Sequence, residues 1–259
     1  MTEEEINICL NSEDVNTRIA AIHRADATPV NIDKALNDKN FRIRELAASH
    51  PNISEANINK ALTDKDVFIR VKAIKNPKVT EANINKALDD DFHRVRISAI
   101  QNPVATENNI DKAIDSTNDY IVMTALHHKN VTDANIRKVL ANGSITCKFQ
   151  AIAHNNISPD TLMEVLLDRH YIADIKLAVM KSNKITEEHI LLALSKPKSI
   201  SLKLKSLKHN IVNERILNKA ISSKYLEVKL AALNHPKATD AIKRKAANDP
   251  EIISHLLKQ

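Results

Sequence analysis

The chain has 259 residues with a single glycine, no tryptophan, three tyrosines and four phenylalanines, and its net charge is +6. Phosphate-cradling loops, dinucleotide-binding turns, tight hairpins and nucleophile elbows all depend on glycine, so this composition argues against the enzyme classes that use them. The same shortage argues against an all-β or α/β fold. The basic character is concentrated in residues 201–259, which carry +7.

A repeat of 26 residues organises the sequence. Buried-type aliphatic residues recur at this interval and resume after a two-residue insertion: Ile6, Ile32, Ile58, Ile84, Ile110, Ile136, Leu162, Ile190 and Leu217. One such unit cannot bury its apolar face alone, whereas stacked units can. We therefore predict an all-α fold, a right-handed α-solenoid of about ten two-helix repeats. It forms one domain over 1–259, with regular repeats at 1–156, an irregular 28-residue repeat at 157–184 and degenerate, basic repeats at 185–259.

Each repeat is predicted to form two short helices. Serine or threonine precedes the first helix and can cap its free N–H groups, at Thr2, Thr28, Ser54, Thr80, Thr106, Thr132, Ser158 and Thr186. The second helix ends at Asn-Pro or His-Pro, because the residue before proline is pushed out of the α region. In the third repeat the apolar positions are Ile58, Ala61 and Leu62 in the first helix and Ile69, Ala73 and Ile74 in the second.

The repeat resembles a known type of helical repeat. Residues 50–77, HPNISEANINKALTDKDVFIRVKAIKNP, are similar to the leucine-rich repeat variant, in which His-Pro-Asn-Thr leads an apolar helix, an Asp-rich turn and a Val-Arg helix. The segment also resembles a short HEAT repeat, with its turn Asp six residues before an Arg, in Asp38/Arg44, Asp64/Arg70 and Asp90/Arg96. Later repeats depart from this pattern, as in Ser116/Val122 and Asn142/Lys148. The resemblance implies a binding scaffold without a particular activity.

A cationic column follows the second helices, at Arg18, Arg44, Arg70, Arg96, Lys148, Lys176, Lys203 and Lys229. In the first repeats we expect these side chains to bond aspartates of the inter-helix turns and to fix the stacking. The alternative is a cationic stripe suited to phosphates. A separate lysine column is expected to face solvent, with contact to an acidic partner as the alternative: Lys34, Lys60, Lys86, Lys112 and Lys138, resuming at Lys219 and Lys245.

The basic C-terminal repeats raise the possibility of phosphate binding, through Lys203, Lys205, Lys208, Lys229, Lys243, Arg244 and Lys245. Ordinary solvation of the end of a solenoid is the favoured explanation of these charges, and phosphate binding is the alternative. Tyr225 is the one aromatic residue close to these lysines in the sequence, so stacking of single-stranded bases has little support.

The sequence predicts no catalytic residue, no cofactor and no metal site, and we expect the protein not to be an enzyme. Five histidines occupy a repeat position that also holds Asn76 and Asn102, which indicates hydrogen bonding at helix ends: His50, His128, His154, His209 and His235. Cys9 and Cys147 fall in buried repeat columns and are expected to be inert. The four-cysteine cluster that accompanies some leucine-rich repeat variants is absent, so we expect no iron–sulfur centre. HEAT-like DNA glycosylases depend on tryptophan in their active sites, and this chain has none.

The favoured function is a scaffold that binds a macromolecular partner, most simply another protein, on an extended concave surface. The residues expected to contact it are non-core positions of the second helices: Phe68, Lys72, Arg94, Ser98, Tyr120, Thr124 and Gln150. The alternative is a solenoid that binds DNA or structured RNA through its C-terminal lysines. Without a leader or a membrane span, and with two distant cysteines, we expect a cytoplasmic protein and no membrane partner. The Lys-, Ile- and Asn-rich composition suggests a bacterial or viral origin.

Overall fold

A computed structural model describes residues 1–196 and 198–258 of the chain. In these residues the chain forms 20 helices and no strand, which confirms the predicted all-α repeat fold. The helices pack into two compact units, Met1–Asn135 and Ile136–Gln259, and each is described by itself.

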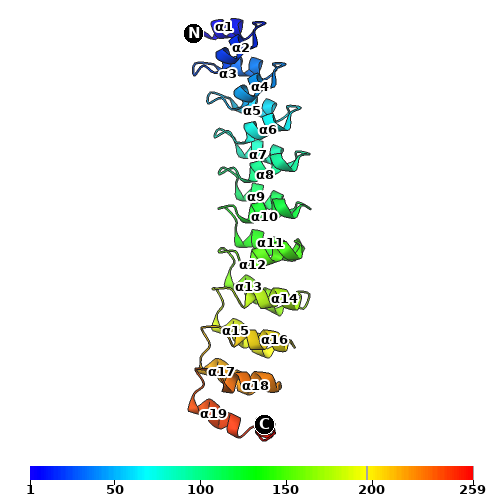
Figure 1. The fold of residues 1–259 in the computed structure, drawn as a ribbon, viewed down its shortest axis with the longest axis vertical. Coiled ribbons are helices and arrows are strands. Elements are labelled where there is room, and N and C mark those ends of the chain that lie inside the picture. The colour runs from blue at the N-terminus through cyan, green and yellow to red at the C-terminus, as the bar shows by residue number, and fades with distance from the viewer. Residues whose placement is uncertain (197, 259) are drawn as a thin grey trace. The chain divides into compact units, whose positions relative to one another are not determined.

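In the N-terminal unit, the first helices of successive repeats pack on one another and the second helices form a second layer (Figure 1). The first helices are α1 (Glu3–Cys9), α3 (Pro29–Ala35), α5 (Glu55–Ala61), α7 (Glu81–Leu88) and α9 (Glu107–Ile114). The second helices are α2 (Val15–Ile22), α4 (Phe41–Ala48), α6 (Val67–Ile74), α8 (His93–Ile100) and α10 (Asp119–Leu126).

The C-terminal unit repeats the same two-layer arrangement. Helix α11 (Asp133–Asn142) contains the boundary between the units. The other first helices are α13 (Pro159–Leu167), α15 (Glu187–Ser195), α17 (Glu214–Ile221) and α19 (Asp240–Ala247). The second helices are α12 (Ile145–Ile152), α14 (Ala173–Val179), α16 (Ile200–Ser206), α18 (Leu226–Leu233) and α20 (Pro250–Leu256).

The core consists of the periodic isoleucines and the alanines beside them. Ile32, Ile58, Ile84 and Ile110 are completely buried at the centres of the first helices. Small alanines at the neighbouring positions let the helices approach closely. Each inner repeat buries its apolar face against the repeats before and after it. This nearest-neighbour packing leaves the outer sides of both layers free for other interactions.

Five of the predicted N-caps work together with an asparagine three residues later that the sequence did not single out: Thr28, Ser54, Thr80, Thr106 and Thr132. At Thr2, Ser158 and Thr186 the residue at that position is glutamate, threonine or histidine. Thr80 accepts the backbone N–H of Asn83, and the side chain of Asn83 accepts the backbone N–H of Thr80, which makes a complete capping box. The Asn83 amide also donates to Asn59 Oδ1 of the preceding repeat, at 2.9 Å. The same bond between repeats joins Asn31 to Asn7 and Asn109 to Asn85. We call this row of buried amides the asparagine ladder.

The cationic column forms the expected ladder in the first repeats. Arg18 pairs with Asp38, Arg44 with Asp64, and Arg70 with Asp90, in each case across 20 residues to the turn of the next repeat. The nitrogen–oxygen distances are 2.6–2.8 Å. Each Arg Nη1 also donates to a carbonyl of the turn in its own repeat. We call these pairs the Arg–Asp ladder.

The ladder stops at Arg96. Its Nη1 still donates to the carbonyls of Asp90 and Asp91, but the residue 20 positions later is Ser116. The Ser116 hydroxyl accepts the backbone N–H of Asn118, so the turn is kept while the carboxylate is absent.

The single glycine of the chain lies just after α11. The Gly143 N–H donates to the Val139 carbonyl, at 2.8 Å. A Cβ atom at this position would lie 2.7 Å from the same oxygen. Close backbone approach, and not a left-handed conformation, is therefore the reason for glycine here.

Candidate binding surfaces

Most of the predicted partner-binding residues lie on the surface of the second helices. Phe68, Lys72, Arg94, Tyr120 and Gln150 are exposed, and Thr124 is partly exposed. Ser98 is the exception, because it is only 5 % exposed. Its side chain is too short to extend past its neighbours, whereas Lys72, at the equivalent position one repeat earlier, reaches solvent.

A row of exposed aromatic side chains marks the start of four consecutive second helices. Phe41 begins α4, Phe68 and Tyr120 are the second residues of α6 and α10, and Phe92 is the N-cap of α8. These side chains are 39–58 % exposed. We call them the aromatic row. The sequence prediction missed Phe41 and Phe92, because their spacings depart from 26 residues by one or two positions.

Arginines hold two rings of the aromatic row in place. The Arg94 guanidinium lies 4.9 Å from the centre of the Phe68 ring, and that of Arg70 lies 5.2 Å from the centre of the Phe92 ring. In each case the arginine and the ring belong to adjacent repeats. The contact fixes the rings without burying them, so they remain available as rigid apolar anchors.

A groove of about 540 Å³ lies beside the C-terminal end of the aromatic row. Tyr120 and Ile97 supply its apolar surface, and Lys75, His93 and Arg94 line its edge. Ser98 lies in the same lining. None of the described lining residues is acidic, so the groove presents a positive edge next to exposed aromatic side chains.

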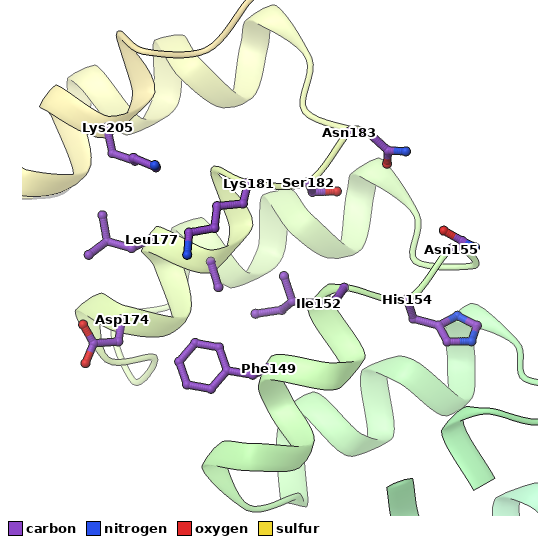
Figure 2. A pocket seen from close by; sticks show the side chains of 12 residues that line it. Phe149, Ile152, His154, Asn155, Asp174, Leu177, Lys181, Ser182, Asn183 and Lys205 are labelled. Carbon is purple, nitrogen blue, oxygen red and sulfur yellow. The ribbon is translucent and has the colours of Figure 1, made fainter. Parts of the chain in front are cut away.

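The C-terminal unit has a larger groove, of about 870 Å³, on the side of its second helices (Figure 2). Figure 2 shows Phe149 and Ile152, from α12, and Leu177, from α14, grouped around one hollow. Asp174 and Lys205 are among the charged residues at its margin. The groove therefore combines an apolar floor with charges of both signs. Lys205, which was predicted to bind phosphate, belongs to this mixed surface.

The remaining predicted phosphate-binding residues do not form one site. Lys229 is a correction to that prediction, because it is buried and pairs with Asp249 and Glu251, at 2.8 and 2.7 Å. The Asp249 carboxylate, followed by that of Glu251, raises the pKa of Lys229. Lys208, Lys243, Arg244 and Lys245 are exposed, and the Lys245 ammonium donates to Asn218.

Lys203 lies in a different environment from these exposed residues. It is 3 % exposed, and its ammonium donates to the carbonyls of Ala193 and Leu194. Burial, with the charges of Lys224 and Lys219, lowers its pKa.

The histidines act at helix ends, as predicted from their exchange with asparagine. His50 Nε2 lies 3.0 Å from the Arg24 carbonyl of the preceding repeat, and its Nδ1 accepts the backbone N–H of Asn52.

Among the described residues, no three His, Cys, Asp or Glu side chains are grouped so as to hold a metal ion. Cys147 is buried, while Cys9 is only partly so. Within the same part of the chain, no helix has the length and apolar character that crossing a membrane requires.

Comparison with known proteins identifies the fold. No protein-family model matches the chain, and no curated protein matches its sequence. A solved structure described as a leucine-rich repeat variant with a novel repetitive structural motif does match it, with a TM-score of 0.51 over 88 % of each chain. The chain has the fold of a leucine-rich repeat variant. The two sequences are 13 % identical, so the match shows the fold alone, that is, the paired helices and their stacking.

Proposed function

We propose that this chain is a non-enzymatic scaffold that binds another protein through the exposed side of its second helices. The observation that carries the proposal is the aromatic row. Aliphatic and alanine side chains fill the core, so packing within the fold does not require large aromatic residues that are 39–58 % exposed. Rigid aromatic side chains at successive repeats are suitable anchors, because little conformational entropy is lost when a partner covers them.

Charge specifies the kind of partner. The groove beside the aromatic row carries Lys75, His93 and Arg94 and has no acidic residue among its described lining. Glu45, in the second helix α4, is already paired, with Arg42 and Lys72. A complementary partner is therefore an extended peptide segment that carries both acidic and apolar side chains.

The alternative, a binder of nucleic-acid backbones, has less support. Lys229 is neutralised by two carboxylates, and Lys205 lines a groove with an apolar floor.

Cys9 and Cys147 are free thiols, which fits a reducing compartment and a partner inside the cell.

Selection from a random peptide library displayed on phage, with the full chain immobilised, tests the proposal. We expect enrichment of peptides that combine Asp or Glu with aromatic or leucine side chains. A selected synthetic peptide should bind the Phe68→Ser/Tyr120→Ser variant at least 10-fold more weakly than the parent chain, since two interface anchors are lost.

The matched control is Ile8→Ser/Val30→Ser, which removes two equally exposed apolar side chains from the first repeat and from α3. This control should bind the selected peptide as the parent chain does. Equal losses in both variants, or selected peptides without acidic residues, would refute the proposal.

A further inference from the structure

A second pocket in the C-terminal unit is lined almost entirely by lysine and serine. It measures about 360 Å³ and lies between the ends of α15 and α17 and the turns that follow them. Its cationic side chains are Lys196, Lys198, Lys203, Lys219 and Lys224. The described lining also contains Ser195, Ser222, Ser223 and Tyr225, and no acidic residue. We call it the lysine pocket.

The lysine pocket occurs where the Arg–Asp ladder has lost its carboxylate. Lys203 takes the position of the ladder arginines, and its ammonium donates to the carbonyls of Ala193 and Leu194 in the last turn of α15. The residue 20 positions later is Ser223, whose hydroxyl accepts the backbone N–H of Tyr225. One repeat later the carboxylate returns, since Lys229 pairs with Asp249. The acid is also missing after Arg96 and Lys176, where Ser116 and Lys196 stand 20 positions later, but at Lys203 its absence coincides with a cluster of lysines.

Without that carboxylate, several ammonium groups face one another. Within the described residues, no ion pair is formed by the other four lysines of the pocket, Lys196, Lys198, Lys219 and Lys224. The hydrogen bonds of the Lys203 ammonium go only to carbonyl oxygens. Burial and the neighbouring Lys224 and Lys219 lower the pKa of Lys203, which is the response of an ammonium group that lacks a counter-charge. A bound anion would relieve this repulsion.

The basic surface continues beyond the lysine pocket. A neighbouring hollow of about 440 Å³ shares Lys196 and Lys198 with it and adds Lys176 and Arg169. The combined surface can hold several negative charges. Because Lys203 is 3 % exposed, a slim terminal group reaches it more easily than the backbone of a duplex does.

We propose that the lysine pocket binds a compact polyphosphate group, of the kind found in inorganic tripolyphosphate or at the end of a nucleoside triphosphate. Ammonium groups are strong donors to phosphate oxygens, and serine hydroxyls at the rim add neutral donors. The Tyr225 ring lies 5.9 Å from the Lys203 ammonium and 5.2 Å from that of Lys224. These cations already occupy the ring, so we expect recognition of the phosphates and not of a stacked base.

Isothermal titration calorimetry of the full chain with tripolyphosphate and with ATP tests the proposal. We expect saturable binding at one site, affinities for the two anions within about 3-fold of each other, and weaker binding as salt is raised from about 50 to about 200 mM. Much tighter binding of ATP would mean that the base is recognised, and it would overturn this part of the inference.

Two variants locate the site. Lys219→Met/Lys224→Met should weaken tripolyphosphate binding at least 10-fold. Ser223→Asp puts the ladder carboxylate back beside Lys203, so it should raise the melting temperature by a few degrees and also weaken binding at least 10-fold. A variant that is more stable and yet does not bind cannot be explained by misfolding.

The matched control is Lys243→Met/Lys245→Met, which removes two exposed cations one repeat later. It should bind tripolyphosphate as the parent chain does. Unchanged binding in Ser223→Asp, or an equal loss in the control, would overturn the proposal. The proposal would also be overturned if the parent chain binds duplex DNA and only the Lys243→Met/Lys245→Met control loses this binding. The C-terminal lysines would then form a nucleic-acid surface.

Discussion

The stacking of the repeats depends on buried charge pairs, and Arg44 allows this dependence to be measured. Arg44 Nε lies 2.7 Å from Asp64 Oδ2, and the two side chains are 7 and 8 % exposed. Arg44 Nη1 also donates to the carbonyls of Asp38 and Lys39. Arg44→Met keeps the aliphatic packing but leaves the Asp64 carboxylate with a hydrogen bond from the backbone N–H of Asp66 and without its cation.

Removing one member of a buried pair costs about 3–5 kcal/mol, because the remaining charge is not compensated. Arg96 offers an internal reference at the same repeat position. It makes the carbonyl bonds but pairs with no carboxylate in the described residues, so Arg96→Met loses about 1 kcal/mol of hydrogen bonding. The expected difference between the two variants is therefore about 2–4 kcal/mol.

Urea unfolding of the full chain, followed by circular dichroism at the helical minimum, measures both variants, and hydrogen exchange shows which repeats open. Adding Asp64→Asn to Arg44→Met removes the unpaired charge and keeps an acceptor for the Asp66 N–H, so about half of the lost stability should return. If Arg44→Met and Arg96→Met cost the same within about 0.5 kcal/mol, or if Asp64→Asn restores nothing, the ladder does not act through its charge pairs.

Three further predictions concern single contacts. Ser116→Asp should extend the Arg–Asp ladder to Arg96 and raise stability by about 1 kcal/mol in urea unfolding, and a loss of stability would show that the turn cannot hold a carboxylate. Asn83→Ala removes the acceptor of the Thr80 N–H and the bond to Asn59, so it should cost about 2–3 kcal/mol, whereas the exposed Asn108→Ala serves as a control near zero. Lys229, followed by backbone N–H groups, lowers the pKa of Asp249, so the stability that this carboxylate contributes is present above its unfolded pKa and is lost as the pH falls through the folded value. Thermal melts of Asp249→Asn, whose amide can still cap α20, should therefore lie below those of the parent chain at pH 7. The difference should begin to shrink below about pH 4, and a constant difference would contradict the linkage.

The repeated features of the fold were predictable because each leaves a periodic signal. The threonine caps, the apolar columns and the pairing of Arg18, Arg44 and Arg70 recur with the 26-residue period. The asparagine ladder was periodic too, but an amide three residues into a helix resembles an ordinary polar residue unless its bond to the previous repeat is known. The lysine column was periodic as well, but the sequence predicted only that it faces solvent. In the structure, Lys34 and Lys86 also donate to backbone carbonyls of the preceding repeat.

The binding surfaces were harder to predict, because they depend on departures from the period. Phe41 and Phe92 lie one and two residues before the repeat position that holds Phe68 and Tyr120, so stepping by 26 positions does not find them. The depth of Ser98 depends on how far the neighbouring side chains extend. The lysine pocket arises where Ser223 replaces an aspartate, and the consequence of that replacement appears only when lysines from separate turns are brought together.

The two ladders also bear on how such a chain can change in length. In the first repeats each Arg–Asp pair joins a donor of one repeat to an acceptor of the next at the same offset of 20 residues, and the asparagine ladder adds bonds at an offset of 24 residues. A duplicated repeat would therefore arrive with both halves of each bond, and a deleted repeat would leave two complementary ends. Within these repeats, gain or loss of whole units keeps both offsets, whereas insertion of a few residues changes them. The number of exposed aromatic side chains on the second helices can thus change with the number of repeats, without redesign of the core.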